Sequence, residues 1–177
     1  MSMHSRLILA AAIAVTASSA ILAEEGPNLG RVATPEEIAS YDIDASPDGQ
    51  GLPPGSGTAK QGEKVYAQKC LGCHGPKGKD GPVMQLVGGN GTIGIEKRPL
   101  KTVGSFWPYA TSVFAYARRS MPFYNSKSLS NDELYATTAY ILYLNGLIGE
   151  NDVMKAQTLA KVQMPNRDGF FPFKRGD

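Results

Sequence analysis

Two cysteines and a histidine stand close together in this 177-residue chain, in the order Cys70, Leu71, Gly72, Cys73, His74. Two thiols three positions apart lie on one turn of a helix, where they reach the vinyl groups on neighbouring sides of a porphyrin. The histidine that follows lies beneath the porphyrin iron and supplies one axial ligand. The motif therefore predicts one heme c, held by two thioether bonds, with His74 bound to its iron.

Three other uses of these cysteines are open at this point. A redox-active dithiol needs a βαβ pattern around the motif, a zinc site needs about four nitrogen or sulfur ligands, and a structural disulfide is strained at this spacing. The chain has two cysteines and two histidines in all, which leaves a zinc site short of ligands. Because no βαβ pattern surrounds the motif, covalent heme attachment is the favoured interpretation.

The N-terminus carries the pattern of a cleavable signal peptide. Arg6 provides a positive charge, residues 7–15 form an apolar run, and small residues follow. The apolar run is short for a bilayer span, although a retained anchor is the alternative. Cleavage after Ala20 or Ala23 predicts a signal peptide over residues 1–23, a periplasmic location, and a mature chain without a membrane span.

Charge is divided unevenly along the remaining chain. Residues 24–50 carry seven acidic side chains against Arg31 alone, whereas the whole chain has a formal net charge of +2. A nucleic-acid-binding protein is normally far more basic. Residues 46–57 are rich in glycine and proline, which excludes a helix interior. We therefore expect an extended acidic arm over residues 24–56 and no nucleic-acid partner.

Two helices are predicted on either side of a glycine-rich stretch. The first covers residues 59–69, with Thr58 as its N-cap. Gly62 inside it lowers helix propensity by about 1 kcal/mol relative to alanine, and this indicates a close crossing with another helix. Residues 72–104 are predicted as loops with one short turn. A second helix is predicted over residues 108–119, beginning at a proline.

The third predicted helix has the clearest start and end. Ser130 and Glu133 form a capping box, apolar residues then recur at helical spacing, and Gly146 suits the C-terminal stop. No strand pair is visible in the sequence. We expect one small all-α domain over residues 57–148, followed by a C-terminal arm over residues 149–177.

The second axial ligand is predicted to be a methionine. His74 is the one histidine outside the signal peptide, so two histidine ligands from one chain are excluded. Four methionines follow the signal peptide: Met84, Met121, Met154 and Met164. Met121 is favoured because Pro122 holds it in an extended conformation at a helix end, from which the thioether can turn towards the heme. Met164 and an open or differently occupied sixth position are the alternatives.

The supporting residues are predicted less directly. An axial imidazole normally donates its second N–H to a carbonyl, and the backbone of Pro82 is our candidate acceptor. Buried heme propionates need donors, for which Trp107, Tyr109 and Arg118 are candidates. Trp107 is also expected to pack against the heme. The alternatives are an ordinary turn at Pro82 and a solvated surface charge at Arg118.

Lysines are frequent around the cysteine motif. They are Lys60, Lys64, Lys69, Lys77 and Lys79, opposed by Glu63 and Asp80. Such a surface steers an acidic redox partner by long-range attraction, or it serves solubility alone.

Several of these motifs together resemble a known family. The sequence CLGCHG, Gly62 with Tyr66, Met121 with Pro122, and Ala139 with Tyr140 resemble class I cytochrome c over residues 57–147. The flanking stretches resemble the cytochrome c subunit of sulfite dehydrogenase and the related Sox sulfur-oxidation cytochromes. These stretches are residues 30–38, 42–44, 51–57, 102–111 and 164–170.

The resemblance implies an all-α class I cytochrome c fold with extended N-terminal and C-terminal arms. It carries over Cys70 and Cys73 as attachment sites for one heme c, and His74 and Met121 as axial ligands. In that family the cytochrome is an electron-transfer subunit. It accepts electrons from a molybdenum-containing sulfite-oxidising subunit and passes them to a downstream cytochrome c or oxidase.

Some choices remain open within this resemblance. A single C-x-x-C-H motif favours the single-heme sulfite dehydrogenase subunit over the longer two-heme Sox relatives. Both arms are expected to contact the partner. A heme enzyme or gas-binding heme protein with an open sixth position is the alternative from a different functional class.

Overall fold

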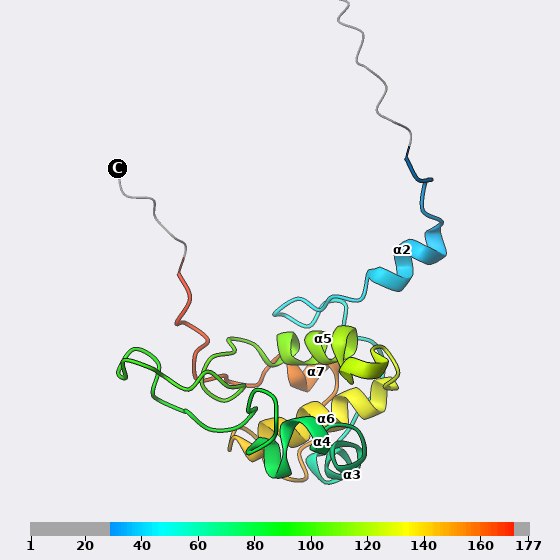
Figure 1. Cartoon of the computed structure of the whole chain (residues 1–177). Helices are drawn as coiled ribbons and strands as arrows, with labels where there is room; N and C mark the ends of the chain where they lie inside the picture. Colours follow the sequence, from blue (N-terminus) through cyan, green and yellow to red (C-terminus); the bar gives the residue numbers. More distant parts are fainter. Residues whose placement is uncertain (1–28, 172–177) are drawn as a thin grey trace, which may run out of the picture. The chain divides into compact units, whose positions relative to one another are not determined.

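The computed structural model describes residues 29–171, so the predicted signal peptide and the outer ends of both predicted arms lie outside the described residues. The helices are α2 (Pro35–Tyr41), α3 (Ala59–Lys69), α4 (Leu71–His74), α5 (Ala110–Ser120), α6 (Asn131–Leu144) and α7 (Ala156–Leu159) (Figure 1). Two 3-10 turns cover Pro76–Gly78 and Phe123–Asn125. Residues 29–171 contain no β-strand, only an isolated bridge between Gly57 and Met154. The all-α prediction is confirmed.

The described residues divide into two units, residues 29–38 and residues 39–171. All the elements from α3 onward, and every residue of the cysteine motif, belong to the second unit. In this part of the chain no helix is both long enough and apolar enough to cross a membrane.

Local capping chemistry sets the beginnings of α3 and α6. The Thr58 hydroxyl accepts a hydrogen bond from Gln61 N, and the Gln61 side chain accepts one from Thr58 N. Ser130 and Glu133 form the same reciprocal pair at α6. Both predicted starts are therefore confirmed. Helix α6 ends at Leu144 with Asn145 as its C-cap, and Gly146 follows with φ +72°, the left-handed conformation that glycine adopts without strain.

Helix α5 begins two residues later than predicted. Tyr109 keeps an extended backbone (φ −138°, ψ 136°) and stands as the N-cap, so the helix starts at Ala110 rather than at Pro108. The Arg167 guanidinium lies over the Tyr109 ring, 5.2 Å from its centroid. This contact with the C-terminal segment accompanies the extended conformation that keeps Tyr109 outside the helix.

Helices α3 and α6 cross in contact, as Gly62 predicted (Figure 1). A Cβ atom built on Gly62 would lie 1.8 Å from the carbonyl oxygen of Ala136. The backbones of α3 and α6 thus approach each other more closely at Gly62 than any side chain there would allow. The rings of Tyr66 and Tyr140 pack beside this crossing, with centroids 5.3 Å apart.

The main hydrophobic core lies around α5 and α6. Phe114 and Tyr135 pack with ring centroids 4.5 Å apart, and both are fully buried. The segment predicted as a C-terminal arm contributes four buried side chains to the same core: Met154, Leu159, Val162 and Met164. The described part of that segment therefore completes the domain, because its apolar residues would otherwise remain in water.

The predicted N-terminal arm is not extended throughout. Its residues 35–41 form α2, which begins with a capping box between Thr34 and Glu37. We name residues 42–57 the N-terminal strap, because side chains of α5 and α6 hold this non-helical stretch by its backbone. Arg118 donates to Ile43 O at 3.3 Å, Tyr135 to Pro53 O at 2.8 Å, and Asn131 to Pro54 O at 3.0 Å.

A charge pair links α3 to the start of α6, and its contribution is testable. The ammonium of Lys69 lies 2.9 Å from Glu133, and this hydrogen bond, followed by that from Ser130 N, lowers the pKa of Glu133. A carboxyl group whose pKa is lowered on folding stabilises the fold above its unfolded pKa, and this stabilisation is lost as the pH falls through the folded pKa.

Glu133→Gln keeps an acceptor for the cap and removes the charge. We expect the free energy of unfolding to fall by about 0.5–1 kcal/mol at neutral pH, because the pair is partly exposed. The difference from the wild-type protein should shrink between neutral pH and an acidic pH below the lowered folded-state pKa of Glu133, where residue 133 is neutral in both proteins. Urea unfolding at the two pH values measures this, and an equal difference at both would contradict it.

Candidate functional site

Helix α4 carries the cysteine motif from Leu71 to His74 on a single turn, and Cys70 immediately precedes it. Cys70 ends α3 and caps α4, and its carbonyl accepts hydrogen bonds from the backbone N–H groups of Cys73 and His74. Gly75 ends the turn with φ +73°, and the Tyr66 hydroxyl, reaching from α3, donates to its carbonyl at 2.8 Å. The short helix is thus fixed at both ends against α3.

The two thiols are free and differ in their surroundings. Cys73 is exposed, whereas Cys70 is half-buried beside Tyr66 and Tyr140. Burial raises the pKa of Cys70 to about 11, so its thiol is protonated at neutral pH. The two cysteines are not joined to each other in this structure.

The His74 imidazole contacts a different carbonyl from the one predicted. Nδ1 of His74 lies 3.0 Å from the backbone oxygen of Met84, not of Pro82. The chain turns back along α4 at Gly81, where a Cβ would lie 2.2 Å from Cys73 O, and Val83 N then donates to that oxygen. This reversal brings the carbonyl of Met84, two residues after Pro82, to the His74 ring.

The Met84 contact assigns the two nitrogens of His74. A carbonyl oxygen only accepts hydrogen bonds, so Nδ1 is the protonated nitrogen in this contact. The lone pair of Nε2 is therefore available for a metal.

The methionines fall into three environments. Met154 and Met164 are 5% and 4% exposed within the hydrophobic core, whereas Met84 is 74% exposed. Met121 is partly buried at the C-cap of α5, with φ −120° and ψ 146°. This extended conformation is the one predicted for a residue before proline, and it frees the Met121 side chain from the helix.

The candidate propionate donors have protein partners. Trp107 packs on the core, and its ring meets that of Tyr116 edge-on at 5.6 Å. Arg118 holds the N-terminal strap through Ile43 O, and Tyr109 contacts Arg167. The strap contact of Arg118 joins residues 75 apart in the sequence, and no local pattern signals it.

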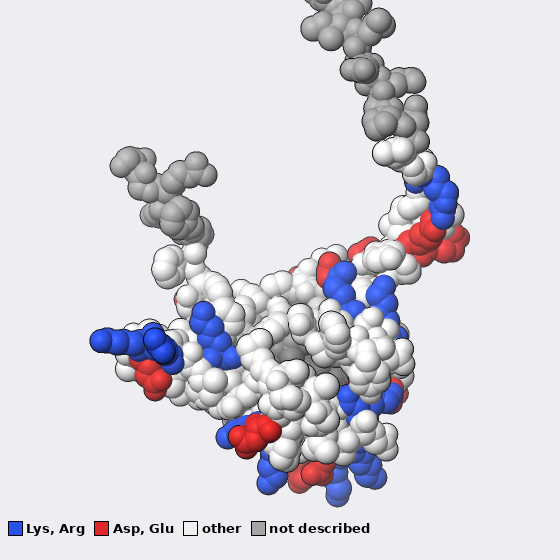
Figure 2. All heavy atoms as spheres, in the orientation of Figure 1, with Lys and Arg blue, Asp and Glu red and all other residues white. Residues whose placement is uncertain are grey.

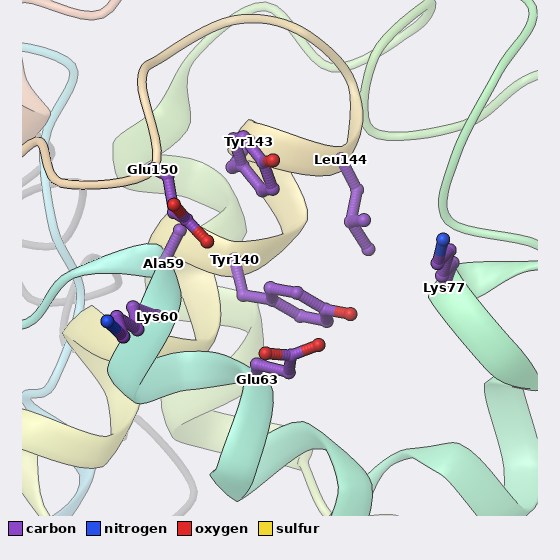
Figure 3. Close-up of a pocket in the computed structure, with 8 residues that line it drawn as sticks. All are labelled: Ala59, Lys60, Glu63, Lys77, Tyr140, Tyr143, Leu144 and Glu150. Atoms are coloured by element: carbon purple, nitrogen blue, oxygen red, sulfur yellow. The ribbon is translucent and has the colours of Figure 1, made fainter.

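A separate cavity of about 190 Å³ lies beside α3 and α6 (Figure 3). Tyr140 and Tyr143 line it together with charged side chains of both signs, among them Glu63 and Lys77. None of the motif cysteines, His74 or Met121 lines this cavity, so it is not part of the candidate heme site.

The donor set fits a covalently attached heme. Two free thiols three positions apart suit two thioether bonds, the imidazole offers one nitrogen to iron, and the Met121 thioether is a suitable second ligand. Within residues 29–171 no group of three or more His, Cys, Asp or Glu side chains is arranged to hold a metal ion.

Sequence reasoning missed one residue at this site. No role was assigned to Asn145 from the sequence, yet its buried amide bonds the loop that follows the heme motif. The sequence offered only an asparagine beside the predicted helix stop at Gly146; its burial, which requires the amide to find partners, is visible only in the structure.

Comparisons with known proteins agree with this geometry. A family model described as "Cytochrome C oxidase, cbb3-type, subunit III" matches residues 57–141. A chain in the crystal structure of the sulfane dehydrogenase SoxCD from Paracoccus pantotrophus is 43% identical, with a TM-score of 0.76. That match covers 84% of this chain and 73% of the SoxCD chain.

A curated relative matches over a shorter stretch. Cytochrome c-551 from Bacillus subtilis (strain 168) is 53% identical over 34 residues, which are 18% of this chain and 30% of that protein. The predicted resemblance to cytochrome c and to the Sox cytochromes is confirmed by these matches, as is the class I cytochrome c fold. This chain belongs to the cytochrome c family, whose members transfer electrons through covalently bound heme c.

Proposed function

We propose that this chain is a periplasmic, single-heme electron-transfer subunit. It accepts electrons from a molybdenum-containing sulfite-oxidising subunit and passes them to a downstream cytochrome c or oxidase. The observation that carries the proposal is the SoxCD match, which covers 84% of this chain and so extends well beyond the family domain at residues 57–141. The flanks, and not only the heme domain, have counterparts in a sulfur-oxidising complex.

Each residue of the candidate site has a definite task in this proposal. Cys70 and Cys73 hold the heme, and His74 and Met121 are the axial ligands. The heme supplies a one-electron centre whose potential its ligands set. The Met84 carbonyl orients the His74 ring. With both axial positions filled by protein side chains, no coordination position is open to a substrate, which favours electron transfer over catalysis at this site.

The charged surface suits an acidic electron acceptor. Lys60, Lys64, Lys77 and Lys79 are exposed around α3 and α4, whereas Lys69 is paired with Glu133. Figure 2 shows several basic side chains, with acidic ones among them, at the end of the domain where Figure 1 places these two helices. Attraction between such a surface and an acidic protein speeds their association at low salt.

The N-terminal segment suits a contact with the molybdenum subunit. Leu29, Val32 and Ile38 have exposed side chains, and residues 29–38 belong to a different unit from the one that holds the heme motif. Exposed apolar side chains in a segment rich in acidic residues are typical of a surface that another protein covers.

The proposal is tested by isolating the full-length chain with its partner. A tagged copy purified from its native host should bring down a molybdenum-containing protein, detected by elemental mass spectrometry. Sulfite or thiosulfate added to the complex should reduce the heme, followed by its visible spectrum, whereas the isolated chain should not respond. Either a heme-free chain or a heme that sulfur compounds reduce without a molybdenum protein would contradict the proposal.

A variant lacking residues 24–38 separates the N-terminal contact from the heme site. Residues 39–171 remain intact in it, so the heme spectrum should be unchanged while the molybdenum protein is lost from the purification. A complex of unchanged yield would show that this segment is not the contact.

A further inference from the structure

We infer that Asn145 is a positioning residue for the axial imidazole: its side-chain amide fixes the loop whose Met84 carbonyl bonds His74. The inference rests on the proposed heme site, and it adds a residue at the far end of α6 that does not itself touch the imidazole.

The side-chain amide of Asn145 both donates a hydrogen bond to the loop backbone and accepts one from it. Its Nδ2 donates to Leu86 O at 3.2 Å, and its Oδ1 accepts from Gly88 N at 3.1 Å. The second Nδ2 proton is donated to Ile141 O at 2.9 Å, which ties the amide to its own helix. Asn145 is 6% exposed, so these bonds are largely shielded from water.

Residues 102–104 hold the same loop as well. Val103 N donates to Leu86 O at 3.2 Å, and the Thr102 hydroxyl donates to Gly88 O. A Cβ built on Gly104 would lie 2.1 Å from Oδ1 of Asn145, so the amide lies directly against the backbone of this second segment. Residues 86–88 are therefore clamped jointly by the end of α6 and residues 102–104.

This clamp sets the position of the Met84 carbonyl. The side chain of Met84 is 74% exposed and cannot anchor its own backbone. The peptide is fixed instead by its neighbours, through Val83 N to Cys73 O at 3.2 Å and Leu86 N to Gly78 O at 2.9 Å. Asn145 restrains Leu86 from the other side, and the 3.0 Å contact between Met84 O and Nδ1 of His74 follows from both restraints.

The hydrogen bond at Nδ1 of His74 affects the orientation of the imidazole and the donor strength of its other nitrogen. A carbonyl acceptor fixes the plane of the imidazole and makes its other nitrogen a stronger donor to iron. A stronger donor stabilises ferric over ferrous iron and lowers the reduction potential. Loosening the loop should therefore expose the Nδ1 proton to solvent and raise the potential, although no ligand has been changed.

The test compares Asn145→Ala with Asn90→Ala in the heme-containing full chain. Asn90 is a matched control, because its amide donates to Asn145 O at 3.2 Å but makes no bond to residues 86–88. Hydrogen–deuterium exchange of the His74 Nδ1 proton is followed by NMR in the reduced state. We expect about tenfold faster exchange in Asn145→Ala with an upward shift of the potential, and neither change in Asn90→Ala.

Global unfolding is measured in parallel, because a purely structural role would lower stability without a selective effect on His74. Equal exchange in Asn145→Ala and the wild-type protein, or equal acceleration in both variants, would overturn the inference. Should Asn145→Ala fail to retain heme, Thr102→Val removes a different side-chain bond to the same loop, the one to Gly88 O. It should also accelerate exchange, and no acceleration there would overturn the inference.

A wild-type chain without heme would overturn the proposed function as well, whereas an intact heme with unchanged exchange would overturn this inference alone.

Discussion

Met121→Leu is expected to abolish the methionine-to-iron charge-transfer band at the red end of the visible spectrum and to let the ferrous heme bind carbon monoxide. Leucine fills a similar volume but has no sulfur to donate. Met121 leaves the end of α5 in an extended conformation, which frees its side chain to reach a ligand position. We also expect the reduction potential to fall by on the order of 0.1 V or more, since axial ligands set it over roughly 0.8 V.

The same substitution at the other methionines is the matched control. Met84 is exposed, and Met154 and Met164 belong to the core, where a leucine changes stability by less than about 1.5 kcal/mol. All three variants should retain the band and exclude carbon monoxide. Loss of the band in Met164→Leu, with its retention in Met121→Leu, would reassign the ligand. Carbon monoxide binding by the wild-type protein at neutral pH would favour a heme enzyme or gas-binding protein instead.

Gly62→Ala is expected to reduce the free energy of unfolding by about 3 kcal/mol. Its new methyl group would lie 1.8 Å from Ala136 O, and because that oxygen belongs to the backbone of α6, the two helices must separate. Helix propensity alone predicts the opposite sign, a gain of about 1 kcal/mol. The sign of the change in urea unfolding therefore decides between the crossing and the isolated helix.

Gly72→Ala is the control for this effect. Gly72 is also helical, but nothing lies within 4 Å of a Cβ built there. We expect that variant to be unchanged or more stable by up to about 1 kcal/mol. A Gly62→Ala protein within about 0.5 kcal/mol of the wild type would mean that α3 and α6 do not meet as closely as described.

Elements whose signals are local were predictable from the sequence. The starts of α3 and α6 depend on a cap and a residue three positions later, and both were predicted at the observed residues. The same reasoning applied to Thr34 and Glu37 would have located α2, but the acidic, glycine-rich surroundings favoured an extended arm. The late start of α5 is different, since Tyr109 meets Arg167 from a distant segment.

The amino-acid sequence by itself determined the heme motif, the helical class and the close crossing at Gly62. The heme motif and the helical class depend on residues within one or two helical turns of each other. The crossing depends on the lack of a side chain at Gly62. Only the tertiary structure decided that the Met84 carbonyl, not that of Pro82, meets His74, and that the C-terminal segment completes the core. These depend on the path of a glycine-rich loop, and Asn145 restrains that path from 57 and 59 residues away. Contacts over such separations form only when the chain has folded, because no local conformational preference encodes them.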